Sequence, residues 1–124
     1  MTKTLNSYPQ HVLIVEDDAF IALDIECVME SAGFEIIDTV GRVDRALDLL
    51  DQKKPDLALL DYNLGDENSV PIAKKLGRMN VPFMFISGQT RETVLSEMDE
   101  EHLVVTKPFV PDHLISHAHS LIEA

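Results

Sequence analysis

The sequence predicts a single α/β domain, built as a doubly wound parallel sheet of five strands with helices on both faces. Short apolar runs of strand length alternate five times with longer segments whose apolar residues recur at helical spacing. A chain of 124 residues suits one buried core, and it contains no internal repeat or low-complexity tract. Alternating strands and helices favour parallel pairing, because each helix returns the chain to the edge where the next strand starts.

The first β-α unit consists of a strand at residues 12–15 and a helix that ends at Gly33. The apolar face of this helix repeats every three or four residues and comprises Ile21, Ile25, Val28, Met29 and Ala32. Cys27 is the single cysteine and lies among these residues in the sequence, which excludes an internal disulfide. We expect Cys27 to be buried in the core.

The second and third units follow the same plan. Apolar residues at 34–40 predict a half-buried strand, and those at 43–50 predict a helix that ends before Pro55. Residues 57–60 form an unbroken apolar run between two aspartates, which is typical of a central strand buried on both faces. The next helix can be capped by Asn68 or Ser69 and carries a proline in its first turn.

The last two units complete the sheet. Residues 82–86 predict the fourth strand, and Thr90 can cap a short helix that contains Val94, Leu95 and Met98. Residues 103–105 predict the fifth strand. A last helix opens at Pro111, with an apolar stripe formed by Leu114, Ile115, Ala118, Leu121 and Ile122.

Polar side chains follow four of the five strands. In a doubly wound sheet, ligands bind at the carboxyl edge of the strands, near the point where the strand order reverses. We therefore expect these side chains to converge on one small cleft. They are Glu16, Asp17 and Asp18 after the first strand, Asp61 after the third, Ser87 after the fourth and Lys107 after the fifth.

This set of side chains predicts a site for a phosphoryl group. Clustered carboxylates repel one another unless a cation is present, and their oxygen atoms favour a hard ion such as Mg²⁺. Lys107 adds a positive charge, and the Ser87 hydroxyl can donate a hydrogen bond to an anion. Asp61 is then placed to attack phosphorus, because phosphoryl transfer needs mostly alignment and charge neutralisation.

Simpler explanations exist for each residue alone. Acidic residues at the start of a helix can merely complement its dipole, and we expect this role for Asp18 in particular. Asp61 can begin a turn, and Lys107 can be an exposed loop residue. The joint placement of complementary groups at one sheet edge favours a functional site.

These residues resemble the receiver domain of two-component response regulators, from residue 11 to residue 124. The segment from Val12 to Asp18 is similar to the first strand and acidic pocket of that family, which implies Asp17 as a direct metal ligand and Glu16 as a ligand through water. By the same resemblance Asp61 is the phosphoacceptor and Asn63 offers its backbone carbonyl to Mg²⁺. The implied strand order is 2-1-3-4-5, as in flavodoxin-like folds, and residues 1–10 form an N-terminal extension.

The resemblance also implies that Ser87 is the switch hydroxyl and that the Lys107-Pro108 peptide bond is cis. One departure is Val104, where many receivers carry a tyrosine or phenylalanine. The segment from Phe85 to Gly88 is similar instead to stand-alone receivers with a Phe-Ala-Thr-Gly motif, which generally lack that aromatic residue. Asn63 and Gln89 would flank the path of the water that hydrolyses the acyl phosphate, so both are expected to set its lifetime.

The expected function is that of a switch. It takes a phosphoryl group from the histidine of a sensor kinase or phosphotransfer protein, and a separate protein reads the result because the chain ends after the last helix. The only catalysis expected is its own phosphorylation and dephosphorylation. The 22 acidic against 10 basic residues argue against binding to nucleic acid or an anionic membrane. Without an export signal or a long apolar run, a cytoplasmic location is expected.

Two other classes of protein share part of this pattern. A flavodoxin-like electron carrier shares the sheet order but needs a phosphate-binding loop after the first strand, where three carboxylates stand instead. An aspartate-based phosphatase needs an acid two residues after Asp61, where Asn63 stands. A metal site formed by His113, His117 and His119 is conceivable, but a solvated helix face is the favoured interpretation.

Overall fold

The computed structural model describes residues 10–88, 93–94 and 102–123. The predicted helix that Thr90 would cap lies largely outside the described residues, although Val94 is buried. The elements in chain order are β1 (His11–Val15), α1 (Ala19–Ser31), β2 (Ile36–Val40), α2 (Val43–Gln52), β3 (Leu57–Asp61), β4 (Asn63–Leu64), β5 (Glu67–Asn68), α3 (Val70–Arg78), β6 (Phe83–Ser87), β7 (Val104–Thr106) and α5 (Pro111–Glu123).

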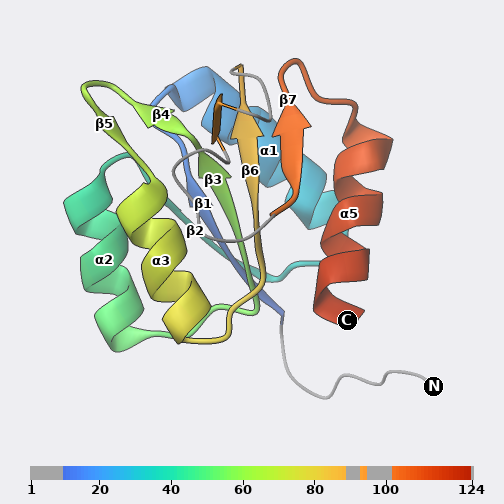
Figure 1. The fold of residues 1–124 in the computed structure, drawn as a ribbon. Helices are drawn as coiled ribbons and strands as arrows, with labels where there is room; N and C mark the ends of the chain where they lie inside the picture. Colours follow the sequence, from blue (N-terminus) through green and yellow to red (C-terminus); the bar gives the residue numbers. More distant parts are fainter. Residues whose placement is uncertain (1–9, 89–92, 95–101, 124) are drawn as a thin grey trace.

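A five-stranded sheet has the order β2-β1-β3-β6-β7, with every neighbouring pair parallel. This confirms the predicted order 2-1-3-4-5, since β6 and β7 are the fourth and fifth strands of the sheet. The carboxyl ends of the strands meet at one edge, which is at the top in Figure 1. β1 and β3 lie side by side with Val15 opposite Leu60, so the residues that follow them come close together.

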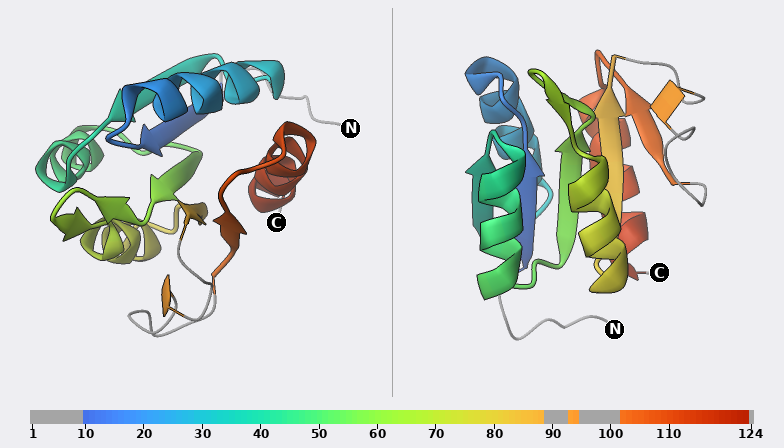
Figure 2. Two further views of the ribbon diagram at one scale, coloured as in Figure 1. Left: turned by 90° about the horizontal axis from the view of Figure 1, so that it is seen from above. Right: turned by 60° about the vertical axis from the view of Figure 1, so that its left-hand side comes forward.

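Helices cover both faces of the sheet, with α1 and α5 on one face and α2 and α3 on the other (Figure 2). The alternation of side chains along β1 supplies both cores. Leu13 and Val15 pack on the side of α2 and α3, whereas Val12 and Ile14 pack on the side of α1 and α5. β1, β3 and β6 are buried along their whole length, and for β3 this confirms the prediction from its unbroken apolar run.

The prediction that Cys27 is buried is wrong, because its side chain is exposed. Ile25 and Met29 are the residues of α1 that face the core. Successive residues of an α-helix are about 100° apart, so a residue two positions after Ile25 points away from the sheet. Apolar neighbours in the sequence misled the prediction because they do not share one helix face.

A short antiparallel hairpin, whose strands β4 and β5 are two residues each, lies between β3 and α3. It was not predicted. The start of α3 also refines the capping prediction. Ser69 occupies the N-cap position but its side chain makes no capping hydrogen bond. The Asn68 Oδ1 atom instead accepts from the Val70 amide at 3.0 Å.

Charged groups join the strands at the opposite edge of the sheet. The His11 Nε2 atom lies 2.7 Å from Asp38 Oδ2, and Lys53 Nζ lies 3.2 Å from the same oxygen. The His11 amide donates to Asp56 Oδ2 at 2.8 Å. Burial alone would raise the pKa of Asp38, but Lys53 and His11 outweigh it and lower that pKa.

Among the described residues, no helix is long and apolar enough to cross a membrane.

Candidate functional site

Three carboxyl groups meet where β1 and β3 end. Glu16, Asp17 and Asp61 each place one oxygen within 4.8 Å of the others, so the structure brings these predicted metal ligands together. Glu16 and Asp61 are only 3% and 7% exposed, whereas Asp17 is exposed. The Glu16 amide donates to the Val40 carbonyl at 2.9 Å, which fixes the backbone at the start of the cluster.

Lys107 connects the two buried carboxylates. Its Nζ atom lies 3.2 Å from Glu16 Oε1 and 3.3 Å from Asp61 Oδ1. The Lys107 amide donates to the Ser87 carbonyl at 2.8 Å, so the ends of β6 and β7 are joined beside the acidic cluster. The Lys107-Pro108 peptide bond is cis, as the resemblance implied.

The electrostatics of the cluster show an excess of negative charge in a buried place. Burial is the largest influence on Glu16 and raises its pKa to about 7, and Asp61 adds to this rise. The Asp18 amide, which donates to Glu16 Oε2 at 3.1 Å, and Lys107 act in the opposite direction. The pKa of Lys107 is raised, because Asp61 and Glu16 outweigh its burial. One lysine is therefore too little charge for three carboxyl groups, and the oxygen-only donor set fits a hard divalent cation.

Ser87 is fully buried at the end of β6, one residue beyond the partner of Asp61 in the β3-β6 ladder. A Cβ atom built on Gly88 would meet no atom within 4 Å, so the residue after Ser87 leaves space beside it. Gln89, the other residue expected to affect the lifetime of the acyl phosphate, lies outside the described residues. Val104 lies in β7, the fifth strand of the sheet, as predicted; there it is opposite Phe85 and packs against the core on the side of α2 and α3.

Asp18 has a structural role, as expected. Its Oδ1 atom accepts from the amides of Phe20 at 2.9 Å and Ile21 at 3.1 Å, and it caps α1.

The histidines of α5 form no metal cluster among the described residues, since Glu16, Asp17 and Asp61 are the only such group found there. His119 instead lies with Nε2 2.8 Å from the Ala32 carbonyl.

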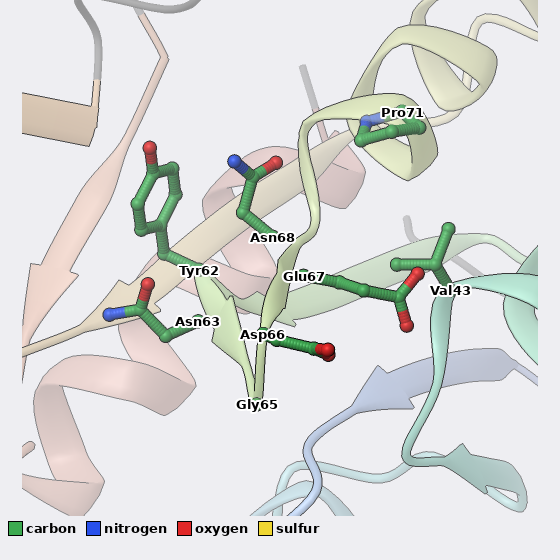
Figure 3. Close-up of a pocket in the computed structure, with 8 residues that line it drawn as sticks. All are labelled: Val43, Tyr62, Asn63, Gly65, Asp66, Glu67, Asn68 and Pro71. Carbon is green, nitrogen blue, oxygen red and sulfur yellow. The ribbon is translucent and has the colours of Figure 1, made fainter.

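Asn63 begins the β4-β5 hairpin and is exposed. The hairpin borders a cavity of about 390 Å³ next to the end of β3, also lined by the starts of α2 and α3 (Figure 3). Sequence reasoning missed this hairpin and its cavity. The signal that could have found them is Gly65-Asp66, because glycine followed by a small polar residue is typical of a two-residue hairpin loop.

Comparison with known proteins agrees with the fold. The model of the response regulator receiver domain family matches residues 12–119. The chain is 31% identical over 118 residues to the cell cycle transcriptional regulator CtrA of Caulobacter vibrioides, covering 90% of this chain and 49% of that protein. It is 30% identical over 103 residues to the phyllosphere-induced regulator PhyR of Methylorubrum extorquens, covering 81% of this chain and 39% of that protein.

Solved structures show the same likeness. The solution structure of SdrG from Sphingomonas melonis is 32% identical with a TM-score of 0.78, over 94% of this chain and 98% of that one. A response regulator receiver protein from Sinorhizobium medicae has the same fold, with a TM-score of 0.85 at 23% identity over 94% of this chain and 96% of that one. The chain belongs to the response regulator receiver domain family. It spans half or less of the two curated regulators named above.

Proposed function

We propose that Asp61 accepts a phosphoryl group from the histidine of a sensor kinase or phosphotransfer protein, and that a separate partner protein reads the change. The observation that carries this proposal is the position of Lys107, whose ammonium group contacts both Asp61 and Glu16 beside the three-carboxylate cluster. The same cation can hold a phosphoryl oxygen once Asp61 is modified. The protein then catalyses only its own phosphorylation and dephosphorylation.

The chemistry follows from the donor set. An Asp61 carboxylate oxygen attacks the phosphorus of a phosphohistidine, the P–N bond breaks, and its electron pair stays on the imidazole. We propose Asp17, Asp61 and the Asn63 carbonyl as direct ligands of Mg²⁺, with Glu16 acting through water. Bound Mg²⁺ would neutralise the negative charge that the carboxylates and the phosphoryl group bring together.

The switch depends on the two groups that flank the phosphoryl position. An acyl phosphate adds negative charge within reach of Lys107 and of the Ser87 hydroxyl. Both residues terminate strands at one side of the sheet and are linked through the Lys107 amide. A shift toward the phosphoryl group would therefore alter the surface around β6 and β7, which a partner can read.

The surface beside Lys107 supports a protein as the phosphodonor. A groove of about 630 Å³ with a mainly apolar lining lies between α1 and the start of α5 and includes Lys107. Phe20 on α1 is 83% exposed, and Val110 before α5 is 51% exposed. Phe20 and Val110 do not line the groove, but each directly adjoins a lining residue in the sequence, Ile21 and Phe109. Exposed apolar side chains next to a groove are typical of protein interaction sites, and this groove reaches the proposed phosphoryl site through Lys107.

Incubation with acetyl phosphate and Mg²⁺, followed by intact-mass measurement, tests the proposal. Wild type should gain the mass of one phosphoryl group, and Asp61→Asn should gain none. Asp48→Asn, a change of an exposed acid in the middle of α2, is the control and should be labelled like wild type. Labelling of Asp61→Asn would refute the assignment of Asp61. A yellow flavin chromophore, or sustained turnover of a generic phosphoester, would favour one of the two other classes of protein.

A further inference from the structure

The β4-β5 hairpin determines where the Asn63 backbone carbonyl points. Opposed residues of an antiparallel ladder alternate between pairs that exchange hydrogen bonds and pairs that do not. The Ser69 amide donates to the Tyr62 carbonyl at 3.0 Å, which makes Tyr62 and Ser69 a bonded pair. Asn63 and Asn68 are the next opposed pair, and so they do not exchange hydrogen bonds. The Asn63 carbonyl therefore points away from β5 and outside the hairpin ladder.

The residues on either side of Asn63 are anchored. Tyr62 is 5% exposed, and its amide donates to the Ile86 carbonyl of β6 at 3.4 Å. Leu64 is 4% exposed and packs in the core on the side of α2 and α3. Asn63 itself is exposed, and Figure 3 shows its side chain on the opposite side of the hairpin from those of Asp66 and Glu67. The backbone at Asn63 is thus held between two buried neighbours.

The turn of the hairpin requires glycine for its backbone conformation. Gly65 has a φ of +70°, and a Cβ atom built there would meet no atom within 4 Å. A larger side chain is therefore opposed by the positive φ and not by a clash. φ is positive at Gly65 but not at Asp66, so the two-residue loop is a type II′ turn, whose first central position favours glycine and tolerates asparagine better than β-branched residues. The turn keeps Leu64 opposite Glu67 and thereby fixes the phase of the ladder at Asn63.

We propose that Gly65 is a positioning residue for metal binding: the turn it permits keeps the Asn63 carbonyl directed out of the hairpin, ready to serve as a ligand. This inference rests on the proposed function and adds a requirement to it. Tyr62 and Leu64 still hold the position of Asn63 in a hairpin that loses its turn, but the phase of the ladder, and with it the direction of the Asn63 carbonyl, is less tightly fixed, which opposes metal binding. Groups that orient a metal ligand typically change metal affinity about 10-fold or more when they are lost.

The test measures the Mg²⁺ dissociation constant by titration calorimetry on the full chain. Gly65→Val should raise this constant about 10-fold, and Gly65→Asn should raise it less, because this turn position accepts asparagine better than a β-branched residue. Gly33→Val is the matched control, since Gly33 also has a positive φ, of +103°, and open space around it, but follows the far end of α1. This variant should lose stability while it keeps the wild-type constant. Gly65→Ala provides a milder change if the valine variant does not fold, as judged by circular dichroism.

A further variant separates the carbonyl from the side chain. Asn63→Ala keeps the backbone carbonyl and should bind Mg²⁺ within about twofold of wild type, since the amide group is not the ligand. Equal constants for Gly65→Val and wild type would overturn the inference about Gly65. An equal loss in Asn63→Ala and Gly65→Val would overturn it too, because the side chain would then be the ligand. If wild type itself binds no Mg²⁺, the proposed function fails, which is a distinguishable result.

Discussion

Replacement of Glu16 by glutamine tests the electrostatics of the acidic cluster without metal. Glu16 is buried beside Asp61, and its pKa is raised from 4.5 to about 7, mainly by burial. Between these two values the folded protein keeps a proton that the unfolded chain releases. A rise in pH across this interval therefore favours unfolding.

The magnitude follows from the two pKa values. The difference between 4.5 and about 7 corresponds to about 3 kcal/mol of unfolding free energy, at about 1.36 kcal/mol for each pH unit. This cost is absent below pH 4.5 and complete above about pH 7. Glutamine carries no charge at any pH and can still accept the hydrogen bond from the Asp18 amide. Glu16→Gln should therefore be more stable than wild type at pH 8, by up to about 3 kcal/mol, and about equal to it near pH 4.5.

The assay is urea unfolding followed by circular dichroism, at pH 4.5, 6 and 8 with a chelator present. Glu30→Gln, a change of an exposed acid on α1, is the control and should show no such dependence on pH. Saturating Mg²⁺ should stabilise wild type more than Glu16→Gln at pH 8, because the ionised carboxylate favours the ion. A Glu16→Gln variant that is less stable than wild type at pH 8 without metal would refute the reasoning, as would a difference that does not change with pH.

Three further predictions concern the scaffold. Asp18→Ala should lower the free energy of unfolding in urea by about 1 kcal/mol, because the amides of Phe20 and Ile21 lose their capping acceptor. The control Asp24→Ala, on the exposed part of α1, should have little effect. Equal losses in the two variants would contradict the capping role of Asp18. Leu59→Ala should lower the free energy of unfolding by about 2 to 5 kcal/mol, since this side chain is 1% exposed in the central strand and its removal leaves a cavity. A smaller loss would show that the neighbouring side chains fill the cavity. Cys27 should react with one equivalent of a disulfide reagent in the folded protein, and a thiol that reacts only after urea is added would contradict its exposure.

The sequence was informative where burial imposed a simple pattern. Residues 57–60 had to be apolar because β3 is covered on both faces, and the aspartate after them marked the sheet edge where ligands bind. The ends of parallel strands share one edge, so the meeting of Glu16 and Asp61 could be predicted from the order of the strands. The structure then supplied what only tertiary packing determines, such as the contact of Lys107 with Glu16, 91 positions away along the chain.

Other features left too weak a pattern. β4 and β5 are two residues each, which is shorter than any periodic signal, and only Gly65-Asp66 indicated a turn. Cys27 was judged by its neighbours in the sequence and not by its angle around the helix. The depth at which Glu16 is buried, which controls its pKa, depends on helices and strands from the whole chain.

The pair of His11 and Asp38 has a practical consequence for engineering. His11 begins β1 and Asp38 lies in the middle of β2, while the acidic cluster follows the carboxyl ends of β1 and β3, roughly 17 Å from His11 for a strand of five residues. Exchanges at this far edge can therefore adjust the melting temperature without touching the reacting groups. A graded series of such variants would show how far the free energy of unfolding can fall before phosphoryl labelling of the acidic cluster declines.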